Sequence, residues 1–270
     1  MKIITIAILI LASTGCTHYY YAPNAASIPA FKEKNTFKLN AGYSSGETVQ
    51  GADIQLSYSV SPKFGVMVNS FFTGSKDKQT DFYGLSNVFG QPYYNVGSSG
   101  TESGTGSYIE GAFGYYQPVG IKKIWVFETY AGVGIGGEKH IYSNSQTAKL
   151  NLVKLFLQPS FSYASAKETL EIGVSSRFSY LNLKVNQNNL SSDDGNRKNL
   201  DEVIAHPSSI LWEPAIKISV GGKGLKAYIE TIFSNNLSNQ YLVQEHSNFN
   251  LGIQLSIGNG EQKVKNAGEN

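Results

Sequence analysis

Apolar and polar residues alternate one by one along most of this chain. Alternation with a period of two predicts β-strands, because successive side chains of a strand point to opposite faces. Helical periodicity is nearly absent, so the sequence predicts an all-β fold. The pattern appears in ten segments, at residues 36–44, 51–60, 64–72, 107–117, 124–136, 150–163, 169–180, 210–220, 225–234 and 249–257.

The connections between these segments alternate in length. Short turns follow the second, fourth, sixth and eighth segments, and the links after the third, fifth, seventh and ninth are longer, at 73–106, 137–149, 181–209 and 235–248. Only the first hairpin is short on the long-loop side. Short periplasmic turns and long extracellular loops are typical of outer-membrane barrels, in which closure satisfies every strand edge in lipid. We therefore expect a transmembrane antiparallel β-barrel of about ten strands.

Alternation alone does not say which face of a strand points outward, and a soluble sandwich or a lipocalin-like barrel with an apolar interior is the alternative. Aromatic residues near the strand ends favour a membrane barrel, because they resemble interfacial girdles. Charge favours it too, because the apolar face carries no charge, and we expect the polar face to line the lumen. That polar face carries ten charged residues, Lys38, Asp53, Glu110, Glu128, Lys154, Glu171, Arg177, Glu213, Lys217 and Glu230.

Opposite charges stand at similar depth on neighbouring predicted strands. The expected pairs are Glu128 with Lys154, Arg177 with Glu213, and Lys217 with Glu230. A narrow barrel is largely filled by side chains, so these residues favour a structural network that keeps the barrel closed. A path for ions or small solutes along the charged wall is the alternative.

The chain opens with an apolar run at residues 3–12. Its length is typical of a secretory leader and too short for a bilayer-spanning helix. Small residues follow at 13–15, and then Cys16, the single cysteine of the 270 residues. This order resembles the lipobox of bacterial lipoproteins, in which the cysteine is lipidated and becomes the first residue. An ordinary cleaved leader with a chance cysteine nearby is the alternative.

Several stretches resemble one family, the lipobox-bearing β-barrel proteins of Bacteroidota outer membranes. They are YYYAPN, IPAFKEKNTF, GYYQPVG, LFLQPSFSY and WEPAIKI. The resemblance covers most of the chain apart from 73–106 and the polar tail, and it implies location and fold only, because the family has no settled activity. The last predicted strand, with Asn250, Gly252, Leu255 and Ile257, also resembles the C-terminal signal read by the barrel-assembly machinery, although its final residue is not aromatic.

These observations divide the chain into a leader at 1–15, a lipidated linker at 16–35, the barrel at 36–257 and a polar tail at 258–270. THYYY lacks the acidic residues that resemble a surface-export signal of that group. We therefore expect the anchor in the periplasmic leaflet, with Tyr19, Tyr20 and Tyr21 at the headgroup level. Both chain ends should then lie on the periplasmic side.

A lipid on Cys16 is the one covalent group that we expect, without a cofactor or a metal. The expected partners are outer-membrane lipids, other outer-membrane proteins, and the machineries that process lipoproteins and assemble barrels. The 22 basic and 20 acidic residues nearly balance, which gives no indication of nucleic-acid binding.

An enzymatic barrel would need a histidine beside an acid at the outer rim. His140, His206 and His246 fall in three different predicted loops, and no HExxH or GxSxG motif occurs. We therefore expect no enzyme activity, but a structural or accessory role, such as a subunit of an outer-membrane complex. A narrow pore and a rim-site lipid or peptide hydrolase are the alternatives.

Three further stretches carry weaker signals. The aromatic stretch at 82–96 is expected to fold over the barrel mouth, with a contact surface for a partner as the alternative. GVGIGG at 132–137 matches a dinucleotide motif, but a polar loop follows it, so its glycines are interpreted as relief of crowding within a strand. The polar cluster at 186–199 lacks EF-hand spacing and predicts an exposed turn.

Overall fold

The structure is a computed structural model that describes residues 19–76, 103–142, 145–192 and 195–258. Within these residues, no helix is long and apolar enough to cross a bilayer. The elements in chain order are β1 (Phe37–Gly46), β2 (Gln50–Ser59), β3 (Phe64–Lys76), β4 (Ser103–Val119), β5 (Trp125–Ile141), β6 (Thr147–Ala164), β7 (Leu170–Asn188), α3 (Gly195–Ala205), β8 (Ser208–Gly221), β9 (Leu225–Phe233), β10 (Asn235–Asn236) and β11 (Ser247–Ile257).

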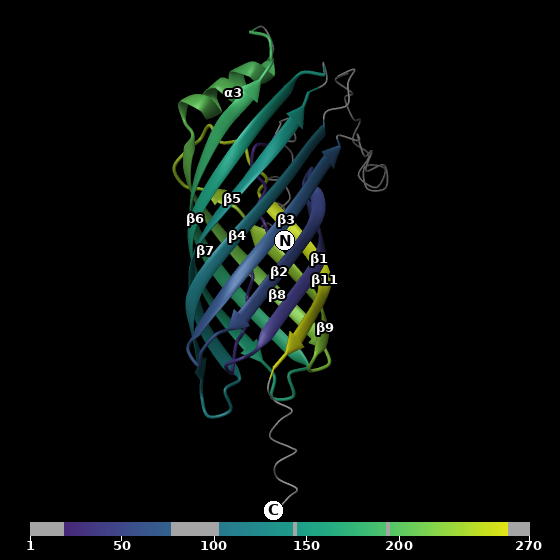
Figure 1. The fold of residues 1–270 in the computed structure, drawn as a ribbon, viewed down its shortest axis with the longest axis vertical. Coiled ribbons are helices and arrows are strands. Elements are labelled where there is room, and N and C mark those ends of the chain that lie inside the picture. The colour runs from purple at the N-terminus through teal and green to yellow at the C-terminus, as the bar shows by residue number, and fades with distance from the viewer. Residues whose placement is uncertain (1–18, 77–102, 143–144, 193–194, 259–270) are drawn as a thin grey trace, which may run out of the picture.

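Ten long strands form one closed antiparallel barrel (Figure 1). Each strand from β1 to β9 pairs with the next, β9 pairs with β11, and β11 pairs with β1 from Phe37↔Ile257 to Gly46↔Asn248. The two-residue β10 adds a short pairing to β8. The predicted ten-stranded barrel is thus confirmed, and ring closure leaves no long strand without two neighbours.

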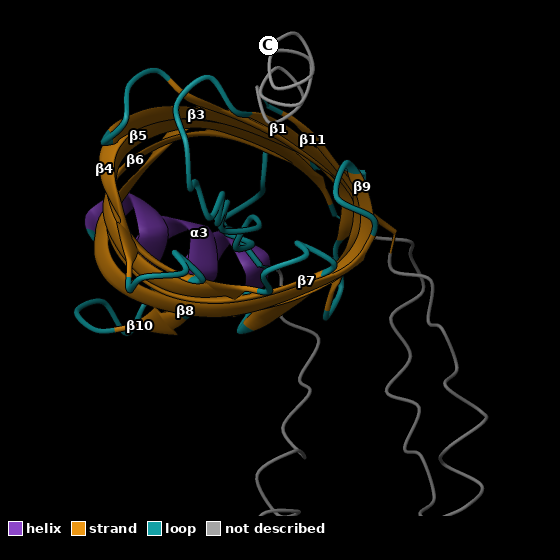
Figure 2. Cartoon of the chain, turned by 90° about the horizontal axis from the view of Figure 1, so that it is seen from below, coloured by secondary structure: helices purple, strands orange, loops and turns teal. Residues whose placement is uncertain are grey.

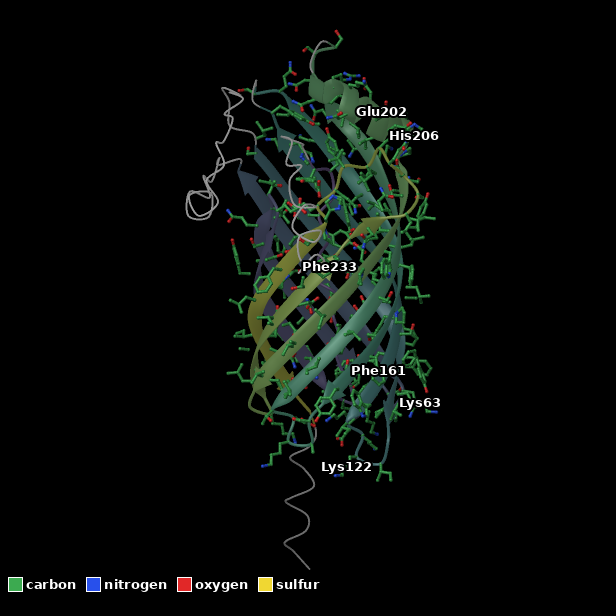
Figure 3. All side chains as sticks on the ribbon, turned by 180° about the vertical axis from the view of Figure 1, so that it is seen from behind. Lys63, Lys122, Phe161, Glu202, His206 and Phe233 are labelled. Carbon is green, nitrogen blue, oxygen red and sulfur yellow. The ribbon has the colours of Figure 1, made fainter. Side chains whose placement is uncertain are left out.

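Lipid-facing and lumen-facing positions alternate along each strand. All ten charged residues of the polar face are buried, with at most 9 % of their surface exposed. Outward residues such as Phe161 and Phe233 point away from the barrel (Figure 3). On β6 the outward apolar positions run from Val153 to Tyr163, about 33 Å of strand, which is roughly 25 Å tall when tilted. That height matches the apolar band of an outer-membrane barrel.

The aromatic residues near the strand ends occupy outward positions of this band. At the short-turn end, Trp125 stacks on Phe161 with ring centroids 5.2 Å apart and contacts Tyr163 at 5.0 Å. Residues of this girdle set are exposed or half-buried, and they comprise Tyr43, Tyr58, Phe64, Phe72, Tyr115, Trp125, Tyr163, Tyr180, Trp212 and Phe233.

Several strands extend past their predicted ends on the long-loop side. β5 continues to Ile141 rather than residue 136, and β7 continues to Asn188 rather than residue 180. In the extension of β7 the pattern inverts, because Leu183 is buried inside whereas Lys184 is exposed outside. A polar exterior around an apolar interior is typical of a barrel in water, so these extensions stand above the membrane. Loops were wrongly predicted there, because the rule of an apolar outer face holds only within lipid.

Helix α3 lies across the long-loop end of the barrel (Figure 2). Its Leu200 and Val203 are buried in an apolar cluster with inward-facing leucines of β6, β7 and β8. The exposed turn predicted at 186–199 is therefore wrong, since 186–188 end β7 and 195–199 begin α3. The stretch at 82–96, predicted to cover the mouth, lies outside the described residues.

Candidate functional site in the barrel lumen

Residues 20–31 lie inside the barrel, and we call this segment the plug (Figure 2). Every residue of the plug is buried except Ala22, which is half-buried. Tyr20 and Tyr21 are 0 % and 3 % exposed, so they do not lie at the headgroup level as predicted. The predicted division into a linker at 16–35 and a barrel at 36–257 did not say where in space these residues would lie. The small side chains between Ala22 and Ser27 suit a narrow lumen, and hydropathy alone does not detect that fit.

The plug crosses the lumen from the long-loop rim to the short-turn rim. At its first end, the Tyr20 amide donates to the Val243 carbonyl at 2.9 Å, in the loop before β11. At its far end, the Lys32 ammonium lies 3.3 Å from the Ala164 carbonyl oxygen, beside the β6–β7 turn. Because an extended chain covers roughly 3.3 Å per residue, the plug is long enough to cross a hydrocarbon core of about 30 Å.

Two lumen carboxylates hold the plug by its backbone. Glu128 accepts hydrogen bonds from the amides of Ala30 and Phe31 at 2.9 and 3.1 Å. Ala30 has a φ of 53°, and such a left-handed residue turns successive amides toward one anion. Glu230 accepts the amide of Ala26 at 2.5 Å. Within the described chain no ion pair reaches either carboxylate, so the plug amides take the place of a cation.

A second group of charges surrounds the middle of the plug, and we call Glu110, Lys154, Arg177 and Glu213 the central network. The Arg177 guanidinium lies 3.2 Å from Glu110, and the Lys154 ammonium lies 3.8 Å from both Glu110 and Glu213. All four side chains are at most 1 % exposed. Two cations and two anions therefore balance inside the wall.

The plug contributes two polar side chains to the central network. The Tyr21 hydroxyl donates to Glu213 at 2.5 Å, and the Lys154 ammonium donates to the Asn24 amide oxygen at 2.8 Å. The Arg177 Nη1 also lies 3.3 Å from that oxygen. The central network thus binds wall and plug together.

The structure changes the partners predicted for these charges. Glu128 and Lys154 do not pair, because Glu128 stands opposite Ser160 whereas Lys154 stands opposite Gly134, further along β5. The prediction placed Glu128 and Lys154 at the same depth in the barrel from their positions along each strand. It did not account for the register between β5 and β6, which separates them. Arg177 stands directly opposite Glu213, as expected, but its ion pair reaches Glu110 across the lumen.

Lys217 also differs from its expected role. It stands opposite Glu230 in the ladder, yet its ammonium has no hydrogen-bond partner among the described residues. It lies over the ring of Tyr228, 4.6 Å from the centroid. A cation over an aromatic face is attracted by the ring quadrupole, so Tyr228 supplies part of its compensation.

Lys226 is a lumen residue that the sequence interpretation missed. Its ammonium and that of Lys38 both lie 3.2 Å from the same oxygen of Glu171. The signal was present in the sequence, because Lys226 has the same parity on β9 as Tyr228 and Glu230.

Glu245 closes the long-loop rim over the first end of the plug. Its carboxylate accepts the amides of Thr48 and Val49 at 2.7 and 2.8 Å, and its own amide donates to the Tyr21 carbonyl at 2.9 Å. Burial raises the pKa of this carboxyl, although the three hydrogen bonds from Thr48 and Val49 lower it. Glu245 therefore connects the first hairpin to the plug.

The three histidines that were predicted to lie in outer loops contact different partners. His140 lies inside β5 rather than in a loop, with its Nε2 3.2 Å from Glu138 and its ring edge against Tyr20. His206 stacks on Tyr241 with centroids 4.3 Å apart. The backbone amide of His246 lies 3.3 Å from Glu47. In the described residues no group of three or more acidic, histidine or cysteine side chains could hold a metal.

Two small cavities lie beside the plug. One cavity of about 10 Å³ lies between Ile28 and the wall near Gly173, and another of about 10 Å³ lies between Asn24 and Tyr108. Each has room for about one water molecule. Cys16, the expected lipidation site, lies outside the described residues.

No family model and no curated protein matches this chain. Among solved structures, the outer membrane protease OmpT from Escherichia coli is 9 % identical with a TM-score of 0.46, covering 87 % of this chain and 99 % of that one. The KdgM porin is 10 % identical with a TM-score of 0.28, covering 82 % and 99 %. The beta domain of the Bordetella autotransporter BrkA is 11 % identical with a TM-score of 0.36, covering 84 % and 100 %. At these TM-scores no likeness carries an argument about activity, and the barrel fold rests on the strand pairing itself.

Proposed function

We propose that this protein is a closed outer-membrane barrel, lipid-anchored through Cys16, with a non-enzymatic structural or accessory role. A subunit of a larger outer-membrane complex is one form of that role. The plug carries the proposal, because residues 20–31 occupy the lumen from rim to rim. A barrel filled in this way offers solutes no continuous path.

The bonds of the plug support a resting state that stays closed. Glu128 and Glu230 have plug amides as donors, and Lys154 donates to Asn24. Without the plug these buried groups would lose those partners, and a buried charge without a partner is costly. The wall is therefore built for an occupied lumen.

The two alternatives have less support. A narrow pore would require the plug to leave the lumen, against the bonds just described. A rim-site hydrolase would depend on the pair of His140 and Glu138. The ring of His140 packs against Tyr20 of the plug. A substrate would have to displace that tyrosine first.

Conductance in planar bilayers tests the proposal. The purified full chain should show no steady ion current, whereas a variant that lacks residues 20–31 should conduct, because the charged wall then lines an open lumen. Deleting the tail residues 259–270, a segment of the same length, serves as the matched control and should leave the barrel closed. Heat-modifiable migration in gels checks that each variant is folded.

A steady current through the folded full chain would contradict the proposal and favour the pore. A silent but folded variant without the plug would also contradict it, because some other element would then close the lumen.

A further inference from the structure

We propose that the lipid on Cys16 is held in the surface leaflet of the outer membrane, and that the barrel closes around its own N-terminal segment to place it there. The inference depends on the lipidation included in the proposed function. It reverses the leaflet expected from the sequence.

The two rims differ in their connections. The turns between β2 and β3, β4 and β5, β6 and β7, and β8 and β9 have three to five residues. On the opposite rim the connections at 47–49 and 142–146 are equally short, but those at 77–102, 189–207 and 237–246 are much longer. Short turns face the periplasm and long loops face outward in outer-membrane barrels. Lys63 and Lys122 mark the short-turn end, and Glu202 and His206 mark the other end (Figure 3). The long-loop rim is therefore the cell-surface rim.

The first described residue lies at that surface rim. The Tyr19 hydroxyl donates to Glu47, between β1 and β2, at 2.8 Å. The next residue, Tyr20, is bonded to Val243 in the loop before β11. From there the chain runs through the lumen to Lys32 at the periplasmic rim, where β1 then begins. The plug therefore enters from the surface side.

Chain length then decides the leaflet. Cys16 precedes Tyr19 by three residues, which reach at most about 11 Å, whereas the hydrocarbon core is about 30 Å thick. With Tyr19 at the surface rim, Cys16 cannot reach the periplasmic leaflet. The surface leaflet is within reach, because Tyr43 of the girdle lies on the same hairpin, roughly 10 Å below Glu47 for a tilted strand.

The barrel wall is lowest at the hairpin of β1 and β2, beside which the N-terminal segment leaves the lumen. β1 and β2 have 10 residues each, whereas β7 on the other side of the barrel has 19. A lipid that leaves next to β1 and β2 has the least protein wall to pass before it meets the membrane.

The packing of the lumen sets the order of assembly. The plug is hydrogen-bonded to the wall through Ala26, Ala30 and Phe31, and the two cavities found beside it hold about 10 Å³ each, far too little for acyl chains to pass. The ring is closed by a continuous ladder between β1 and β11. A lipidated terminus therefore has to be in place before these two strands pair, with the wall forming around the plug.

Labelling of intact cells tests the leaflet. His18→Cys places a thiol between the lipid site and the plug, and Cys16 itself does not react when it is acylated. A membrane-impermeant maleimide should label His18→Cys on intact cells as strongly as Lys198→Cys on α3. Lys122→Cys in the β4–β5 turn should be labelled only after the outer membrane is permeabilised. Lys198 and Lys122 are both exposed, which makes the controls comparable.

Each labelling result either supports or overturns the inference about the leaflet. Labelling of His18→Cys only after permeabilisation, like that of Lys122→Cys, overturns the inference, and so does no labelling in either condition. Mass spectrometry of the N-terminal peptide from the same preparation tests the lipidation separately. An unmodified Cys16 contradicts the proposed anchor, whereas a lipidated Cys16 with periplasmic labelling contradicts only the leaflet.

Discussion

Single residues in the lumen obtain their partners from three sources. Some lie on the neighbouring strand, as Asn69 of β3 does for Glu110 of β4. Others lie across the lumen, as Glu110 does for Arg177. The plug backbone is the third source, and it serves Glu128. A fully buried charge is tolerated only when it is paired, so each source limits which residue can be replaced.

Arg177→Ala should be strongly destabilising, because it leaves Glu110 buried without its closest cation. The expected loss in the free energy of unfolding is about 3–5 kcal/mol. The double variant Arg177→Ala and Glu110→Ala should lose less than the sum of the two single variants, by about 0.5–3 kcal/mol. Unfolding by denaturant in detergent micelles measures all three losses.

Lys217→Ala combined with Glu110→Ala is the matched control, since Lys217 lies over Tyr228 and forms no bond to Glu110. That pair should give additive losses. Additive losses for Arg177 and Glu110 as well would mean that their ion pair contributes no coupling.

Whole strands show a change of environment along their length. In the lower part of β7, Arg177 faces the lumen and Phe178 faces lipid, whereas in its upper part Leu183 faces inward and Lys184 faces water. The strand keeps its period of two from Leu170 to Val185, before a bulge at Asn186, but the polar and apolar faces exchange sides where lipid ends. This inversion explains why the strand ends were predicted too early.

The glycines of β5 make room for the central network. A Cβ added at Gly134 would overlap the hydroxyl of Tyr108, which donates to Glu110 at 3.0 Å and whose ring lies 4.9 Å from the Lys154 ammonium. Gly134→Ala should therefore displace Tyr108 and lower the free energy of unfolding by about 1–3 kcal/mol, as overpacking does.

Gly137→Ala on the same strand is the matched control, because an added Cβ there meets its nearest atoms only at 3.5 Å. Its effect should stay within about 0.5 kcal/mol. Thermal unfolding followed by circular dichroism compares the two variants, and equal losses would show that crowding of Tyr108 is not the cause.

The whole molecule is held in the membrane by its wall. Large apolar side chains such as Ile135, Leu155 and Leu251 are more than half exposed around the band, which only lipid can cover favourably. A lipid on Cys16 adds about 0.8 kcal/mol per buried methylene, a small addition to such a wall. In the proposed arrangement, the anchor therefore has a positional role at the plug's outer end rather than a retaining role.

Removal of the anchor tests this division of roles. Cys16→Ala, carried behind an ordinary cleavable leader in place of residues 1–15, should still fractionate with the outer membrane and resist alkaline extraction. The unaltered chain extracted in parallel is the control. Release of the variant into the soluble fraction would mean that the barrel wall does not suffice.

The sequence by itself determined the strands, their number and the lumen side of ten charged residues. These are local properties, because the period of two and the loop lengths can be counted along the chain, and lipid requires any such sheet to close. Which charged residues form ion pairs inside the lumen is not a local property of the sequence. Whether Arg177 forms an ion pair with Glu213 or with Glu110 depends on the strand register and on the width of the lumen. Neither can be inferred from the residues near Arg177 in the sequence.

Only the tertiary structure decided the place of residues 20–31. That stretch has no period and little charge, so it resembles a linker. Its position depends on Glu128 and Glu230, 98 and 204 residues away from Ala30 and Ala26. Backbone amides, which every sequence possesses, make those contacts. The sequence therefore determined a barrel with a charged interior, and the fold determined that the chain's own N-terminal segment fills it.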